Sequence, residues 1–203
     1  MKAPTLTIVP GPREAEALLA SALVHYERGD AAGAEALFRR VLSALPDHVL
    51  AIRGPAAALF RRDRKAEAAA LLARAVELDP GSDEGWSNLG AARASLGQYD
   101  EAAAAYRRAI ALRPDSAALY YALGRVHRSA GELEDAVAMF ALAAGVDPSE
   151  SKYERALGDA LRAQGRPNDA AAAYRRAILL APDRPEAAVA LGALYRHLRK
   201  PDR

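Results

Sequence analysis

Residues 83–116 read DEGWSNLGAARASLGQYDEAAAAYRRAIALRPDS, and this stretch decides the fold. Apolar residues recur in it at helical spacing, in two runs of about 13 residues each. Gly97 lies between the two runs, where glycine supplies the left-handed backbone that ends a helix. Pro114 follows the second run, and proline cannot continue a helix. The stretch therefore predicts two α-helices joined by a turn.

The same pattern recurs along the chain with a period of 34 residues. Proline returns at Pro46, Pro80, Pro114, Pro148 and Pro182. Alanine returns at Ala34, Ala68, Ala102, Ala136 and Ala170. A large residue follows each alanine by four positions, at Phe38, Leu72, Tyr106, Phe140 and Tyr174, and a small residue follows three positions later, at Val41, Ala75, Ala109, Ala143 and Ala177. A fixed period of this length predicts a solenoid of stacked helical units.

The register of the repeat divides the chain into a short tail and one repeat domain, residues 15–203. We expect repeats at 15–48, 49–82, 83–116, 117–150 and 151–184, followed by an unpaired terminal helix at 185–203. Residues 1–14 contain Pro4, Pro10 and Pro12 and are predicted to be a disordered or extended tail. An alternative is that the tail lies along a groove of the solenoid, because such grooves accept extended segments.

The third repeat carries a combination of residues that identifies a family. These residues are Trp86, Leu89, Gly90, Gly97, Ala102, Tyr106, Ala109 and Pro114. With them the chain resembles the tetratricopeptide repeat family over nearly its whole length. The resemblance implies an all-α fold, a right-handed superhelix of helix-turn-helix repeats, in which the first helix of each repeat lines a concave surface that binds proteins or peptides.

Three features depart from the pattern or need a physical reason. The second repeat has Gly54 and Pro55 where the leucine column runs, and the proline is expected to shorten or kink that helix. Asp63 stands in a turn where glycine is usual. Glycines inside the first helices, such as Gly90, weaken a helix, and we expect them to permit close approach of Ala102 and its equivalents.

Composition narrows the functional classes. The net charge is only +2, so neither nucleic acid nor an anionic membrane is a predicted partner. Cysteine is absent, which excludes disulfides, thiolate metal sites and cysteine nucleophiles. No signal peptide and no run of about 20 apolar residues is present, so a cytoplasmic protein is expected.

Catalytic motifs are missing from the chain, and we expect no enzyme activity, no cofactor and no metal. The sequence has no glycine-rich phosphate loop and no GxSxG motif. His25 and His127 share one column of the repeat and are expected to pack where two helices meet. Glu134 and Asp135 are interpreted as charges at a helix start.

Residues at the groove positions that the family resemblance implies are mostly cationic. The predicted peptide-binding groove consists of Arg53, Arg61, Asn88, Tyr121, Arg125, Arg128, Lys152, Arg155 and Arg162. Arginine pairs with carboxylates through a planar fork, so the expected partner is an extended acidic segment or a chain-terminal carboxylate. The alternative is that these cations form a solvated face without a ligand.

Two classes of function follow. The first is a non-catalytic scaffold or adaptor that assembles proteins. The second is the substrate-recruitment module of a larger bacterial enzyme, of glycosyltransferase, sulfotransferase or aspartyl-hydroxylase type, with its catalytic domain beyond residue 203. The helix at 185–203 is either a solvating cap or the start of a further repeat, and its apolar residues leave self-association open.

Overall fold

The computed structural model describes residues 9–198, apart from the side chain of Arg61, and every regular element in that range is an α-helix. The chain divides into two compact units, residues 1–97 and residues 98–203. The first unit contains α1 (Pro12–Glu27), α2 (Ala31–Ala44), α3 (Val49–Arg61), α4 (Lys65–Leu78) and α5 (Asp83–Ser95). The second contains α6 (Tyr99–Leu112), α7 (Ala117–Ala130), α8 (Leu133–Val146), α9 (Ser151–Ala163), α10 (Pro167–Leu180) and α11 (Pro185–Leu198).

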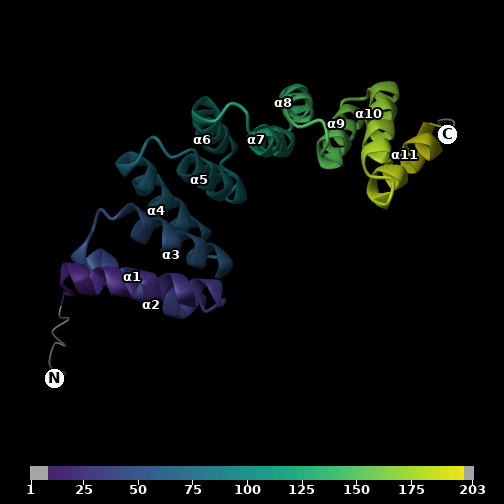
Figure 1. Ribbon diagram of the computed structural model, residues 1–203. Helices are drawn as coiled ribbons and strands as arrows, with labels where there is room; N and C mark the ends of the chain where they lie inside the picture. The colour runs from purple at the N-terminus through teal and green to yellow at the C-terminus, as the bar shows by residue number, and fades with distance from the viewer. Residues whose placement is uncertain (1–8, 199–203) are drawn as a thin grey trace, which may run out of the picture. The chain divides into compact units, whose positions relative to one another are not determined.

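Helices that follow one another in sequence pack against one another within each unit (Figure 1). The contacts run from α1 through α5 in the first unit and from α6 through α11 in the second. The boundary between the units lies at Gly97, inside the third predicted repeat. No helix among residues 9–198 is both long enough and apolar enough to cross a membrane.

The columns of the repeat form the core. The recurring alanines are completely buried at all five positions. The large residues four positions later and the small residues after them are also buried in every repeat. Alanine at the crossing of two helices lets their backbones approach, and the large side chain fills the space beside the crossing. The 34-residue period is therefore the spacing of successive core layers.

Tight turns join the two helices of each pair. Gly29, Gly97, Gly131 and Gly165 have φ between 75° and 85°, the left-handed region in which a side chain is strained. The second repeat places Asp63 there with a φ of 59°, and aspartate is one of the few residues that tolerates this region. The predicted role of the turn glycines is confirmed. Asp63 stands at the same position of its repeat as these glycines and adopts the same left-handed conformation.

Glycines inside the first helices contact aromatic rings and not the small residues that we expected. A Cβ atom at Gly124 would lie 2.8 Å from the ring of Phe140, and one at Gly158 would lie 2.7 Å from the ring of Tyr174. Gly54 contacts Phe38 in the same way. The sequence prediction that glycines such as Gly124 and Gly158 face the recurring alanines is wrong, because the large residue one turn further along the second helix reaches the glycine first.

Two further expectations are corrected. α3 continues through Pro55 and has 13 residues, as many as α5 and α9, so the helix is not shortened. Burial of Ile52, Ala58 and Leu59 on either side of the proline offsets the lost backbone hydrogen bond. α1 begins at Pro12, so the last three residues of the predicted tail are helical, which suits proline at the first position of a helix. Residues 1–8 and 199–203 lie outside the described residues.

Candidate functional site: the faces of the first helices

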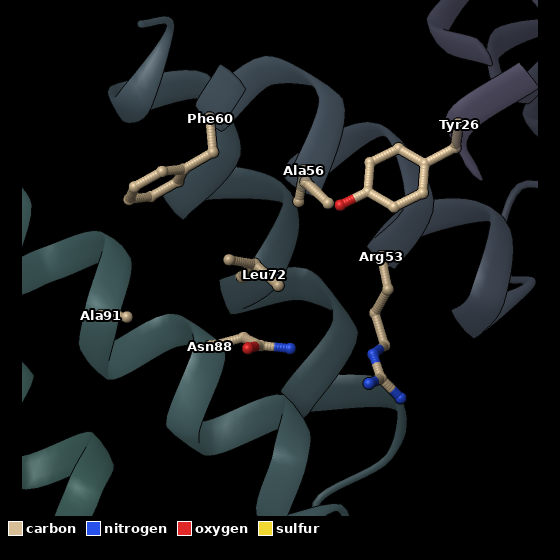
Figure 2. A pocket seen from close by; sticks show the side chains of 8 residues that line it. Tyr26, Arg53, Ala56, Phe60, Leu72, Asn88 and Ala91 are labelled. Atoms are coloured by element: carbon tan, nitrogen blue, oxygen red, sulfur yellow. The ribbon is translucent and has the colours of Figure 1, made fainter. Parts of the chain in front are cut away.

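The first unit has a pocket of about 380 Å³ between the first helices of three successive repeats (Figure 2). Tyr26 of α1 and Phe60 of α3 contribute aromatic rings to it, and Asn88 and Ala91 of α5 line its other side. Ala56, Ala57 and Leu72 complete the apolar part of the lining. This cavity, which we call the first-helix pocket, therefore offers a mainly apolar surface with one amide group.

Arg53 lies at the edge of the first-helix pocket, but its charge is already neutralised. Its guanidinium forms an ion pair with Glu84, at the start of α5. The Arg53 side chain is four-fifths buried, whereas the side chain of Glu84 is 68% exposed, so solvent reaches the pair from the Glu84 side. Because Arg53 is already paired, the pocket is less attractive to a carboxylate than the sequence predicts. Asn88 can both donate and accept a hydrogen bond and suits the backbone of a bound segment.

Sequence reasoning found two residues of this pocket and missed its apolar walls. Arg53 and Asn88 were both predicted, and the structure brings them to one pocket. Tyr26, Phe60 and Ala91 were missed, although they stand at positions nine and twelve of their repeats, which the family resemblance assigns to the groove. The prediction favoured charged and amide side chains there, so the aromatic residues of the first two repeats were left out. The side chain of Arg61 lies outside the described residues.

The second unit presents three exposed arginines on its first helices. Arg125 and Arg128 belong to α7, and Arg162 belongs to the last turn of α9. Among residues 9–198 none of the three has a carboxylate partner. The Arg125 guanidinium lies 6.0 Å from the ring centroid of Tyr121, and that of Arg128 lies 6.0 Å from the ring centroid of Phe140. These cations remain available to an acidic ligand.

The other two predicted cations of the second unit have internal partners. Lys152 Nζ lies 3.4 Å from Glu150 Oε2, and Arg155 Nη1 lies 3.5 Å from Asp159 Oδ2. Asp159 also accepts a hydrogen bond of 2.8 Å from the hydroxyl of Tyr174. Burial, with this hydrogen bond as the next cause, raises the pKa of Tyr174. Lys152 and Arg155 are therefore less free than Arg125, Arg128 and Arg162.

Tyr121 is part of the packing between two repeats. Its ring centroid lies 5.6 Å from that of Phe140 and 5.5 Å from that of Tyr153, both in tilted arrangements. Such aromatic pairs contribute about 0.5–1.5 kcal/mol beyond the area that they bury. Tyr121 is only partly exposed, and its ring packs α7 against both α8 and α9.

The two histidines in one column each bond a carboxylate across a turn. His25 Nδ1 lies 2.8 Å from Asp30 Oδ2, and buried His127 bonds Glu132 in the same way. The sequence missed that Asp135 joins the second pair, which places three ligand-type atoms within 4.8 Å of one another. Glu132 stands at the N-cap position of α8 without a side-chain capping bond, and Asp135 lies in the first turn, where the helix dipole favours negative charge without a metal.

Comparison with known proteins gives one consistent result. Models described as tetratricopeptide repeat match residues 25–92, 117–150 and 155–203, and a model described as TPR repeat matches residues 90–131. No curated protein matches the chain.

Many solved structures are similar in fold, including two MamA proteins and YrrB. A MamA protein has 25% identity over 82% of this chain and 91% of its own, with a TM-score of 0.77. MamA from Desulfovibrio magneticus RS-1 has 20% identity over 84% and 96%, with a TM-score of 0.78. YrrB, described as a TPR protein with an unusual peptide-binding site, has 19% identity over 85% and 89%, with a TM-score of 0.74.

Proposed function

The chain belongs to the tetratricopeptide repeat family, and from this premise we propose that it is a non-catalytic scaffold that binds extended segments of partner proteins. The observation that carries the proposal is the first-helix pocket between α1, α3 and α5, which combines two aromatic rings with the amide of Asn88. An extended segment inserts a side chain between the rings, and its backbone bonds the amide. YrrB has a peptide-binding site of its own, whereas the proposal for this chain rests on the pocket itself.

The two units differ in the chemistry that they offer to a ligand. The pocket of the first unit is lined mainly by apolar side chains, and its one cation, Arg53, pairs with Glu84. This pocket therefore suits an aliphatic or aromatic side chain. The second unit presents Arg125, Arg128 and Arg162 without carboxylate partners among the described residues, and it suits acidic side chains. We therefore narrow the proposed acidic ligand to the second unit.

A displayed library of random peptides, selected on the immobilised protein, tests this assignment. The variant R125E/R128E reverses two free cations of α7. R107E/R108E reverses two exposed arginines of α6, which also have no carboxylate partner in the described part of the chain, and serves as the matched control. We expect acidic peptides to lose affinity by about tenfold or more for the first variant only. Equal losses for both variants would mean that general charge attraction, and not the first-helix face, holds the peptide.

A further inference from the structure

A second pocket, which shares no residue with the first, lies in the second repeat, where proline replaces the leucine found in four other copies. The seventh position of the first helices is Leu89, Leu123, Leu157 and Leu191 in four copies, Ser21 in the first repeat and Pro55 in the second repeat. Leu89, Leu123 and Leu157 are at most 8% exposed. Beside Pro55 a pocket of about 330 Å³ opens between α2, α3 and α4. We call it the Pro55 pocket.

The shape and lining of the Pro55 pocket follow from the presence of proline where four other copies of the repeat have leucine. A proline side chain is closed onto its own backbone and lacks the reach of leucine. The space that a leucine would fill is bordered by Leu42, Leu59 and Leu71, one from each of the three helices. The wall contains no aromatic ring among the described residues. The pocket is therefore suited to a branched aliphatic side chain.

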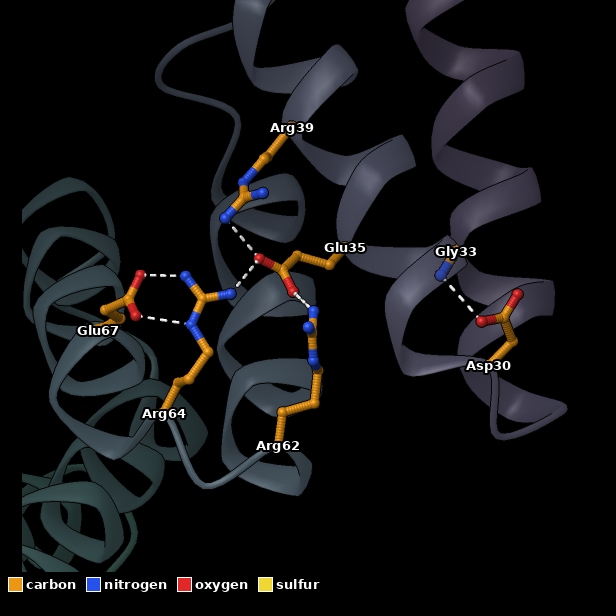
Figure 3. A network of polar contacts seen from close by, with 7 residues as sticks. All are labelled: Asp30, Gly33, Glu35, Arg39, Arg62, Arg64 and Glu67. Atoms are coloured by element: carbon orange, nitrogen blue, oxygen red, sulfur yellow. Dashed lines mark hydrogen bonds and ion pairs between the residues drawn. The ribbon is translucent and has the colours of Figure 1, made fainter.

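Three charged residues, Glu35, Arg39 and Glu67, line the Pro55 pocket and belong to a network of ion pairs that also includes Arg62 and Arg64 (Figure 3). Glu35 is buried, and its two oxygens accept from three guanidiniums: Arg39 at 2.5 Å, Arg64 at 2.7 Å, and Arg62. Arg64 also holds Glu67, with 2.6 Å between Nε and Oε1. Three guanidiniums against two carboxylates leave a surplus of one positive charge.

The surplus charge selects the sign of the ligand. Both oxygens of Glu35 and both oxygens of Glu67 already accept from arginines of the chain, so the surplus positive charge favours an anionic ligand. A guanidinium has five N–H donors, and Arg39, which lines the pocket, uses one on Glu35 while its side chain remains 62% exposed. The free donors of Arg39 can take a second carboxylate in the planar geometry that arginine favours.

We propose that the Pro55 pocket binds the C-terminal residue of a partner protein that ends in leucine, isoleucine or valine. The aliphatic side chain occupies the space of the missing leucine, and the terminal carboxylate pairs with Arg39. A C-terminal leucine, isoleucine or valine carries the branched side chain and a carboxylate on the same residue, which an internal leucine, isoleucine or valine does not. The site lies on the α2 and α4 side of the helices and acts independently of the first-helix pocket.

Fluorescence anisotropy on the full chain tests the proposal with a labelled pentapeptide of glycine and serine that ends in leucine. We expect saturable binding, and a loss of about tenfold when the terminal carboxylate is replaced by an amide, since one charge-assisted contact is removed. A peptide ending in glycine and free leucine are further probes. The glycine peptide should not bind, and free leucine should compete if a lone amino acid is the true ligand.

Variants separate the side-chain contact from the charge contact. P55L restores the missing leucine and should abolish binding, while R39A should weaken it by about tenfold. R40A, the neighbouring arginine that pairs with Glu14, is the matched control and should bind normally. The proposal is overturned if P55L binds like the wild type, if the amide binds as well as the carboxylate, or if no saturable binding occurs at millimolar peptide. If P55L does not fold, the binding of the peptide by R39A still tests the proposal, and unchanged affinity of R39A would overturn it.

Discussion

The ring of Phe38 lies directly against the backbone of Gly54, so closely that a Cβ atom at residue 54 would overlap its Cζ atom. Phe38 is completely buried and cannot rotate away. We expect G54A to lower the free energy of unfolding by roughly 1–3 kcal/mol, because overpacking outweighs the better helix propensity of alanine. Urea unfolding followed by circular dichroism measures the change.

The control for this substitution is Gly192, which lies inside α11 with no atom near the place of a Cβ. G192A should raise the free energy of unfolding by about 0.5–1 kcal/mol through helix propensity alone. If G54A is also stabilising, the close packing of Phe38 on α3 is not what requires glycine at that position.

A second prediction concerns Pro55, which follows Gly54 in α3. P55L restores a backbone hydrogen bond inside α3 and fills the adjacent pocket. It should raise the free energy of unfolding by about 2–4 kcal/mol, measured by thermal and urea unfolding. P12A is the control, since proline at the first position of α1 costs nothing, and its effect should stay within about 0.5 kcal/mol. A neutral P55L would mean that neither the pocket nor the missing hydrogen bond costs stability.

The carboxylate cluster beside α4 predicts a pH dependence of stability. The Arg64 guanidinium, bonded to both oxygens of Glu67, lowers the pKa of Glu67 below its ordinary value of 4.5. A lowered folded-state pKa contributes stability above the unfolded pKa and loses it as the pH falls through the folded pKa. E67Q should therefore be less stable than the wild type at pH 7, and the difference should be smaller at an acidic pH below 4.5. An unchanged difference at both pH values would exclude this ion pair as its source.

Much of the fold was predictable because a fixed period reports directly on the core. The 34-residue columns indicated the helix pairs, the turn glycines and the buried alanines, and the structure confirms each. A period does not identify contacts between neighbouring columns. For this reason the aromatic partners of Gly124 and Gly158 were wrongly expected to be alanines.

The candidate site was predicted less well, because charge pairing depends on positions in neighbouring repeats. Arg53 and Glu84 are both at groove positions, and nothing in the sequence indicated that they neutralise each other. Tyr26 and Phe60, the aromatic residues at groove positions, were left out because apolar residues on a helix usually belong to the core. The pocket is indicated by the sequence only when the apolar side chains at the groove positions are considered together with the charged ones.

The most direct test of the account is whether filling the first-helix pocket blocks partner binding. Ala91 is exposed and lines this pocket, so A91W fills it without disturbing the core, and A36W places the same ring on an exposed position of α2 outside the pocket. Peptides selected on the wild-type protein are titrated into both variants by isothermal calorimetry. We predict that A91W lowers affinity at least about tenfold while A36W binds normally. Normal binding of the selected peptides by A91W would contradict the assignment of this pocket as the binding site.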